Sequence, residues 1–374
     1  MYKANMVLGV IAAAALIGAT LRGEGGASIR EVEPSAYFLP APVPQGTVVS
    51  EPSALAAVAA DTLRYRREAQ GDPGVGPGLP DGVGLDEVGL ITTLEWVVAV
   101  ARADPSRLQD PSFLSRCLDS WRWKPDSAKW AGDIRLTRYL VYAIDGSPEP
   151  TAAQAFALYA LPDDEAGLTE EEAELRRDSL LRFRYTRQEV SGGVYRPGGT
   201  AAERARPLVW LTSAQHEQAL MQGTVAVRLP GAAEPQLYNV HRHNGFPYDR
   251  TVTDSRNQRR MWYFREVDRV GGWGRDPAAK IRLAPGVAVA GDVYNLGLGR
   301  LILLSTGAGL SLVVLADTGG AFLPNLHQLD LYTGVFPDHA SFSRQTSVFG
   351  DRASAWLVEA RPEREGCTPG AAPG

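Results

Sequence analysis

Three aspartates stand in short segments whose residue types and spacing suit acid–base chemistry. Asp317 lies in Ala-Asp-Thr-Gly-Gly-Ala at 316–321, Asp330 lies in Leu-Asp-Leu-Tyr-Thr-Gly at 329–334, and Asp292 precedes them both. Asp317 and Asp330 come at the ends of neighbouring strand-like segments, with glycines that let a bulky ligand approach the backbone. An aspartate with a raised pKa can donate a proton and take one back at neutral pH. The pair therefore predicts general acid–base catalysis.

The same residues also have a structural interpretation. An aspartate near a glycine commonly forms an Asx-turn, and this interpretation stays open for Asp292 and Asp317. Asp330 alternates with apolar side chains in Gln-Leu-Asp-Leu-Tyr at 328–332. Such neighbours would desolvate its carboxyl group, and a like charge on Asp317 would raise its pKa further.

Other segments occur in an order that is similar to one known family. They are Leu-Tyr-Ala-Leu-Pro-Asp-Asp at 158–164, Leu-Val-Trp-Leu at 208–211, Gln-Gly-Thr-Val at 222–225, Asn-Gly-Phe-Pro-Tyr at 244–248, Met-Trp-Tyr-Phe at 261–264, Leu-Ala-Pro-Gly at 283–286 and Ala-Trp-Leu-Val at 355–358. Together with the three aspartates, they resemble the membrane-bound lytic transglycosylase A (MltA) family, whose members cut the glycan strands of bacterial cell walls. The resemblance covers roughly residues 110–360.

Two segments depart from the family pattern. Where the family has Gly-Tyr-Tyr-Glu-Pro, this chain reads Arg-Tyr-Leu-Val-Tyr at 138–142, without the acidic residue. Where the family continues Gly-Gly-Ala-Ile-Lys-Gly, this chain reads Gly-Gly-Ala-Phe-Leu-Pro-Asn at 319–325. These departures leave two interpretations: an active lytic transglycosylase, or a catalytically degenerate protein that binds peptidoglycan or acts as a cell-wall scaffold.

The resemblance implies a role for each candidate residue. Asp330 is expected to be the acid and then the base, Asp317 its catalytic neighbour, and Asp292 a structural support. One carboxyl group suffices because the sugar's own C6 hydroxyl attacks and closes a 1,6-anhydro ring. We expect substrate contacts from Gln222, Gly223, Asn244, Tyr248, Gly319, Gly320 and Tyr139. Asn244-Gly245 is equally compatible with a plain hairpin turn.

Composition excludes several other classes of function. The chain has 374 residues, 44% of them hydrophobic, and a formal net charge of -5, so it is globular and lacks the basic field that nucleic-acid binding uses. The sequence contains no nucleotide or dinucleotide motif. His241 and His243 alternate without a third ligand of matching spacing, so no metal and no cofactor is expected. The expected partner is the peptidoglycan glycan strand, bound by a monomer.

The amino-terminal segment and the two cysteines bear on the cellular location of the protein. An uncharged apolar run from Met6 to Leu21 predicts a signal peptide or an amino-terminal anchor within residues 1–27. We therefore expect export to the periplasm or cell envelope, with membrane contact only through this segment. Cys117 is expected to be a packed helical thiol, and a single bridge to Cys367 stays open.

Short β-rich runs from residue 136 onward predict a mainly β protein with helices near its amino terminus. The resemblance implies a double-psi β-barrel with an inserted smaller β domain. By matching segments, the barrel would use 85–147 and 261–360, and the inserted domain 148–260. Residues 28–84 are expected to form a Pro/Gly-rich linker with a short helix, and 361–374 a disordered tail.

Overall fold

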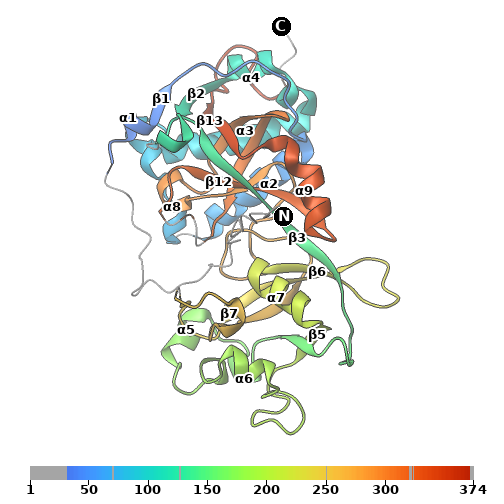
Figure 1. Ribbon diagram of the computed structural model, residues 1–374. Coiled ribbons are helices and arrows are strands. Elements are labelled where there is room, and N and C mark those ends of the chain that lie inside the picture. Colours follow the sequence, from blue (N-terminus) through green and yellow to red (C-terminus); the bar gives the residue numbers. More distant parts are fainter. Residues whose placement is uncertain are drawn as a thin grey trace.

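The computed structural model describes residues 32–69, 71–125, 128–249, 251–319, 322 and 324–370. The expected signal peptide or anchor at 1–27 lies outside the described residues. The chain forms two lobes stacked end to end, with the long strand β3 (Ile134–Asp145) running from one into the other (Figure 1). No helix in the described ranges combines the length and hydrophobicity that crossing a bilayer requires.

The first lobe, here the barrel lobe, contains a closed ring of six strands within the described residues. In ring order these are β13 (Arg352–Ala360), β10 (Leu301–Thr306), β11 (Gly309–Asp317), β9 (Ala288–Ala290), β12 (Gln328–Phe336) and β3. The ring closes because β13 pairs with β3 through Arg352 and Ala353. Two of the pairs are parallel (β11 with β9, β12 with β3), and the other four are antiparallel. The structure is therefore mainly β and contains a barrel, as the sequence predicted.

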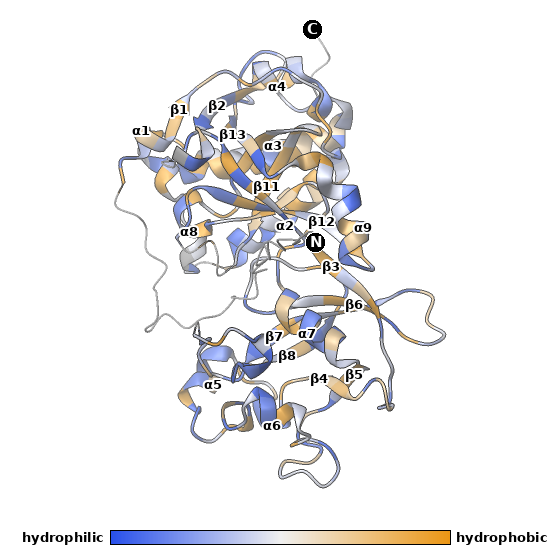
Figure 2. Ribbon diagram, in the orientation of Figure 1, coloured by the Kyte–Doolittle hydropathy of each residue, from blue (hydrophilic) through white to orange (hydrophobic). Residues whose placement is uncertain are grey.

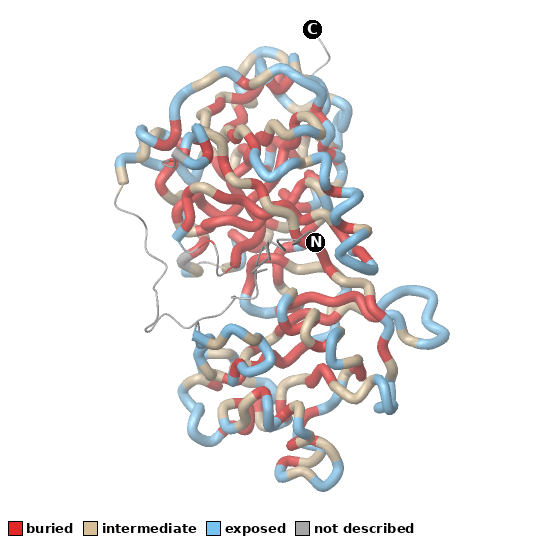
Figure 3. The backbone as a smooth tube through the Cα atoms, viewed as in Figure 1, coloured by how far each residue is buried: buried red, intermediate tan, exposed pale blue. Residues whose placement is uncertain are grey.

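Helices and two further strands cover this barrel. They are α1 (Pro34–Tyr37), β1 (Phe38–Pro40), α2 (Pro52–Glu68), α3 (Glu87–Ala103), α4 (Pro111–Cys117), β2 (Leu118–Trp123), α8 (Val293–Leu296) and α9 (His339–Thr346). α2 packs on β11 and α3 on β13, burying one apolar core with the strands. Figure 2 shows the hydrophobic residues along these strands, and Figure 3 shows how deeply the same segments are buried.

The second lobe spans residues 146–267 and extends the sheet beyond β3. Its elements are β4 (Phe156–Tyr159), α5 (Glu170–Leu175), α6 (Arg187–Ser191), β5 (Pro207–Leu211), α7 (Ser213–Gln222), β6 (Thr224–Arg228), β7 (Gln236–His243) and β8 (Trp262–Val267). The far end of β3, from Tyr142 to Asp145, pairs in parallel with β6. β6, β7 and β8 follow as an antiparallel sheet, and β4 pairs separately with β5.

Residues 268–287, here called the strap, carry the chain back from β8 to β9. Its backbone folds on itself through hydrogen bonds such as Gly272 N–H to Ile281 O, 2.8 Å. It also joins the barrel, since Trp273 N–H donates to Ala316 O at 2.9 Å. Salt bridges link it to the second lobe, where Arg275 contacts Glu171 of α5 at 2.5 Å. The strap is thus a second connection between the lobes, beside β3.

The structure corrects two of the expected boundaries. Residues 32–84 are not a linker, because α2 runs for 17 residues and Leu55 and Val58 lie in the barrel core. Helix formation there is locally encoded: the Glu51 carboxylate accepts from the first N–H groups and Pro52 fits the first turn. Strand β8 belongs to the second lobe, since it pairs with β7, so the barrel resumes only at β9.

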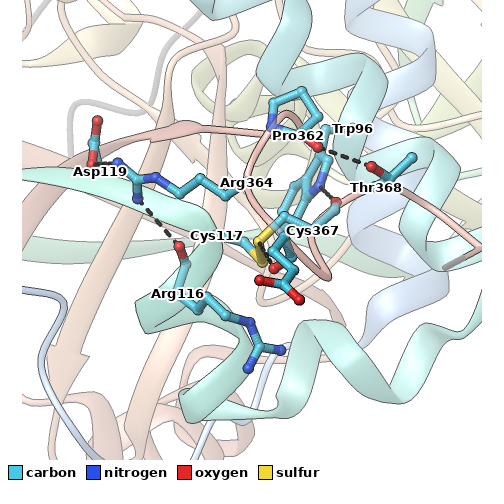
Figure 4. Close-up of a disulfide and its surroundings, with 9 residues drawn as sticks. Trp96, Arg116, Cys117, Asp119, Pro362, Arg364, Cys367 and Thr368 are labelled. Atoms are coloured by element: carbon cyan, nitrogen blue, oxygen red, sulfur yellow. Dashed lines mark hydrogen bonds and ion pairs between the residues drawn. A yellow bond between two sulfur atoms is a disulfide. The ribbon is translucent and has the colours of Figure 1, made fainter. Parts of the chain in front are cut away.

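The prediction of a disordered tail from residue 361 was also wrong, because residues 361–370 are fixed to the barrel lobe (Figure 4). Cys367 forms a disulfide with Cys117 and is fully buried, so Cys117 is not a free thiol. The indole Nε1–H of Trp96 donates to Cys367 O at 2.8 Å. The Arg364 guanidinium donates to Asp119 at 2.5 Å. Residues 371–374 of the expected tail lie outside the described residues.

The disulfide should carry a large share of the stability, because it closes a loop of 250 residues. Removing it with Cys367→Ser should lower the free energy of unfolding by about 2–5 kcal/mol, through the larger entropy of the unfolded chain. Chemical denaturation under oxidising conditions measures this loss. A reductant should destabilise the parent by a similar amount and leave the variant unchanged; a variant as stable as the oxidised parent would contradict the prediction.

Candidate active site

Asp317 and Asp330 lie on either side of one residue of the barrel. Asp317 ends β11 and Asp330 is in β12, and each pairs in register with Ala290 of β9. Residues paired in register project from the same face of a sheet, and neighbouring strands are about 4.8 Å apart. Their α-carbons are therefore about 10 Å apart, with both carboxyl groups on one face. A β-bulge between Leu315 and Asp317 shifts the register, so that Asp317 is the residue that pairs with Ala290.

The neighbouring strand β3 adds hydroxyl groups to this face. Thr137 pairs in register with Asp330, and Tyr139 follows two residues later on the same face. The Tyr139 hydroxyl donates to Oδ2 of Asp317 at 2.9 Å, and the N–H of Thr318 donates to Oδ1 at 2.9 Å. Both oxygens of Asp317 are therefore held in place.

Burial raises the pKa of each carboxyl group to about 7, since Asp317 and Asp330 are only 5% and 4% exposed. At Asp317 the hydrogen bonds from Thr318 and Tyr139 and the charge of Lys280 act in the opposite direction. At Asp330 a hydrogen bond with Thr137 lowers the pKa, while the charge of Asp317 raises it.

Asp330 differs from Asp317 in its hydrogen bonds. Its Oδ1 is buried, with no hydrogen-bond partner among the described residues. A neutral carboxylic acid tolerates such an oxygen at lower cost than a carboxylate does. Within the described part of the chain, one oxygen of Asp330 is therefore left unsatisfied, whereas both oxygens of Asp317 accept hydrogen bonds.

A pocket lies between the two lobes at the end of β11. Its walls include Tyr139, Gln222, Gly223, Asn239, Lys280 and Asp317. Asp330 is not part of the wall. The cavity volume is about 20 Å³, which has room for a water molecule and not for a sugar ring. The structure thus brings Asp317, Tyr139, Gln222 and Gly223 together from the predicted set.

Gln222 and Gly223 reach this pocket because a helix ends there. α7 begins at Thr212, whose side chain and that of Gln215 form a capping box, and it ends at Gln222. Gly223 then takes a left-handed conformation with φ 73°, which favours glycine, and the chain turns into β6. The Oε1 atom of Gln222 is buried and has no hydrogen-bond partner in the described part of the chain. It is an acceptor that a ligand N–H could satisfy.

The remaining predicted contacts lie elsewhere. Asn244 is fully buried, and its side chain donates to Tyr185 O and Arg259 O and accepts from Met261 N–H, each at 2.9 Å. It has no spare N–H for a sugar, so its role here is to hold two chain segments together. Tyr248 is 54% exposed and does not line the pocket. Gly319 is buried beside Asp317, and Gly320 lies outside the described residues.

Asp292 has the geometry of a supporting residue. It is fully buried and caps α8: its carboxylate accepts from Asn295 N–H at 3.1 Å and from Asn295 Nδ2 at 2.8 Å. It also accepts from Asn325 N–H at 2.8 Å, which ties the chain just before β12 to the chain after β9. The first of these segments leads directly into β12, which pairs with Ala290 of β9.

Two pocket residues, Lys280 and Asn239, were not predicted. Lys280 is 2% exposed and its ammonium group donates to Oδ1 of Asn239. The only available signal was composition: the chain has four lysines, against 34 arginines, and one of them follows Pro-Ala-Ala in a segment without other motifs. In the described ranges, no three His, Cys, Asp or Glu side chains cluster as a metal site would require.

Loss of the Asp292 carboxylate should affect folding rather than chemistry. Asp292→Ala leaves three buried N–H donors without their acceptor, so the free energy of unfolding should fall by at least about 2 kcal/mol. Thermal denaturation measures this change. Reactivity per folded molecule should be retained, and a variant that melts like the parent would contradict the assignment.

The raised pKa values of Asp317 and Asp330 predict an unusual pH dependence of stability. Their folded pKa of about 7 exceeds the ordinary 3.8, so between these values the folded state binds more protons than the unfolded state. The free energy of unfolding should therefore fall as pH rises from about 4 to 7 and level off above.

The double variant Asp317→Asn/Asp330→Asn should show a smaller slope and should be more stable than the parent at pH 8, by on the order of a few kcal/mol. Denaturation curves from pH 4.5 to 8.5 test this. Asp178→Asn, at an exposed carboxylate, is the control and should follow the parent. Equal slopes in the double variant and the parent would refute the buried-charge account.

Comparisons with known proteins bear on the fold. No protein-family model matches the sequence, and no curated protein sequence matches it either. Among solved structures, a membrane-bound lytic murein transglycosylase from Agrobacterium tumefaciens matches with a TM-score of 0.56 and 17% identity, over 84% of this chain and 94% of that one. Escherichia coli MltA with bound chitohexaose matches with a TM-score of 0.56 and 14% identity, over 87% and 95% of the two chains.

These matches extend over both lobes and nearly the whole length of the solved chains. At such low identity they establish a shared architecture. They also confirm the mainly β fold class, with its double-psi β-barrel, that the sequence motifs implied. The chain therefore has the fold of the MltA lytic transglycosylases, the family that its three aspartate segments resemble.

Proposed function

We propose that this protein is a murein lytic transglycosylase, which cleaves the β-1,4 bond between N-acetylmuramic acid and N-acetylglucosamine and forms 1,6-anhydro-N-acetylmuramic acid. One observation carries the proposal: a buried carboxyl group of raised pKa, Asp317, lines a pocket between two lobes and has a second carboxyl group, Asp330, beside it. The shared fold with MltA enzymes supports the glycan strand as the substrate.

We assign the acid–base role to Asp317. The resemblance to the family had instead implied Asp330 for this role. Asp317 lines the pocket, whereas Asp330 is buried outside its wall. A pKa of about 7 lets one group serve as acid and base at neutral pH. Asp330 is then the neighbouring carboxyl group on the same face of the barrel.

In the reaction, Asp317 gives its proton to the glycosidic oxygen, and the bond from that oxygen to C1 breaks. The N-acetylglucosamine chain leaves as an alcohol. The resulting carboxylate takes the proton of the C6 hydroxyl group while O6 bonds to C1, so Asp317 ends in its initial state and no water is consumed. The nucleophile is held by the sugar itself, which removes the need for a second activating carboxylate. Asp317 has the hydrogen bond from Tyr139 to hold its orientation in both states.

Gln222 is the best placed residue for recognising the sugar. Its buried Oε1, which has no partner among the described residues, can accept from the N–H of an acetamido group, and the adjacent Gly223 lets the ligand approach the backbone. The cavity of about 20 Å³ is too small for a sugar ring, so we propose that the pocket widens by a movement of the lobes when the glycan binds. Such opening between lobes is a common gating step.

The disulfide supports an exported protein. A structural disulfide between Cys117 and Cys367 is stable in an oxidising compartment such as the periplasm. We therefore propose a periplasmic or envelope location, with the apolar run near the amino terminus as signal or anchor, and action as a monomer on glycan strands.

A second candidate is a catalytically degenerate protein that binds peptidoglycan. The burial of Asp330 and the small cavity favour it, as does the missing glutamate of the Gly-Tyr-Tyr-Glu-Pro segment. Incubation of the protein with purified sacculi separates the two functions. Soluble muropeptides with 1,6-anhydro ends, identified by mass spectrometry, support the enzyme. Sedimentation with the sacculi without release of sugars supports the binding protein, and reducing N-acetylmuramic acid ends would exclude the proposed mechanism.

Replacement of the acid–base residue should abolish most of the turnover. Asp317→Asn keeps the size of the side chain but removes the exchangeable proton, so release of anhydro-muropeptides should fall at least about 100-fold while binding to sacculi is retained. The activity of Asp330→Asn should fall less, because Asp330 does not line the pocket. Asp178→Asn is the matched surface control. Full activity of Asp317→Asn would move the role back to Asp330.

A further inference from the structure

Lys280 is a buried cation at the junction of the two lobes. Its side chain reaches from the strap to β7, where the ammonium group donates to Oδ1 of Asn239 and to the carbonyl of Val240, the latter at 3.4 Å. Asn239 is itself fixed, since its amide donates to the Thr224 hydroxyl at 2.5 Å. Among the charges that act on Lys280, that of Asp317 is the largest.

The strap holds this lysine tightly against the strand of Asp317. Gly272 packs so closely that a Cβ there would lie 2.5 Å from Ala316 O and 3.1 Å from Cβ of Asp317. Gly271 leaves no room either, because its Cβ would lie 2.8 Å from Cβ of Lys280. The two glycines thus allow the strap to lie directly against the acidic end of β11.

We propose that Lys280 is a positioning residue for Asp317, whose ammonium group, held by β7 of the second lobe, sets the charge of the carboxyl group in the barrel. The inference rests on the function proposed above and adds to it a dependence of the acid–base group on the contact between the lobes. Lys280 acts through Asp317 and needs no contact with the sugar.

The groups around Asp317 show why a cation is needed there. Tyr139 from β3 and Thr318 from the chain after β11 donate neutral hydrogen bonds, and Asp330 from β12 offers a like charge. Lys280 is the one cation that acts on Asp317 within the described residues. Without it, burial would keep Asp317 protonated to higher pH, and the carboxylate that must take the C6 proton would be scarce.

The choice of lysine in an arginine-rich chain fits this role. An ammonium group is a compact point charge that three acceptors can satisfy, whereas a guanidinium group needs a wider set of acceptors in one plane. Burial lowers the pKa of Lys280 to about 8, so its charge is easily perturbed by a change in its surroundings. Separation of the lobes would break the hydrogen bonds from the ammonium group to Asn239 and Val240.

The test is a titration of the Asp317 carboxyl carbon by NMR in Lys280→Met, with the signal assigned by its loss in Asp317→Asn. We expect the midpoint to rise by up to about one pH unit relative to the parent, because an opposite charge nearby lowers a carboxyl pKa by an amount of this order. Lys124→Met removes an exposed lysine and is the matched control, with no shift expected. An unchanged Asp317 midpoint in Lys280→Met would overturn the proposal.

A second variant and a second measurement complete the test. Lys280→Gln keeps a donor for Asn239 without the charge, so it should show the same shift and serves if the methionine variant does not fold. In both variants, the acidic limb of the pH profile of muropeptide release should shift to higher pH. Because the NMR titration needs no substrate, a shifted midpoint in a protein that releases no sugars would refute the proposed function alone, and an unshifted midpoint in an active enzyme would refute the role of Lys280 alone.

Discussion

The burial of two carboxyl groups on one face of the barrel is the constraint on which the rest of the site depends. Asp317 and Asp330 flank Ala290 across β9, where little water reaches them. Such groups are costly to ionise, so the surrounding residues must supply compensation. They do so unequally: Asp317 has two donors and a cation, while one oxygen of Asp330 has none in the described part of the chain. This inequality distinguishes the two carboxyl groups by their hydrogen bonds, although burial raises the pKa of each to about 7.

The second constraint is mechanical, because the site lies where two lobes meet. β3 carries Tyr139 to the barrel face and continues, within the same strand, into the sheet of the second lobe. The strap returns alongside, bonded to Ala316 on one side and reaching β7 through Lys280 on the other. Any relative motion of the lobes therefore acts on the residues that hold Asp317. Gln222 of the second lobe and Asp317 of the barrel lobe line the same pocket.

The sequence predicted those features that are encoded locally. The aspartate segments stand out because each combines a carboxylate with a strand end, and the helix 85–103 stands out by its apolar spacing. Lys280 and Asn239 were missed because their importance comes from contacts between residues 41 positions apart. Asn244 was assigned to substrate because its type suits a sugar, and only the folded chain shows that its amide is already satisfied. Glycine and proline in 71–84 suggested a linker, yet the helices on both sides pack on the barrel. The pairing of Cys117 with Cys367 is likewise a property of the tertiary fold.

The continuity of β3 has a consequence for how such proteins can be rebuilt or can diverge. A domain inserted through two loops can be cut out or exchanged between relatives, because its junctions carry no shared hydrogen bonds. Here residues 142–145 pair with β6 while the first half of the same strand closes the barrel. Transplanting the second lobe from another protein would have to splice inside a strand and keep its register, since a shift of one residue reverses every side chain. The two lobes are therefore expected to be inherited as one unit, and chimaeras joined near residue 147 should assemble only when both halves come from chains with the same β3 register.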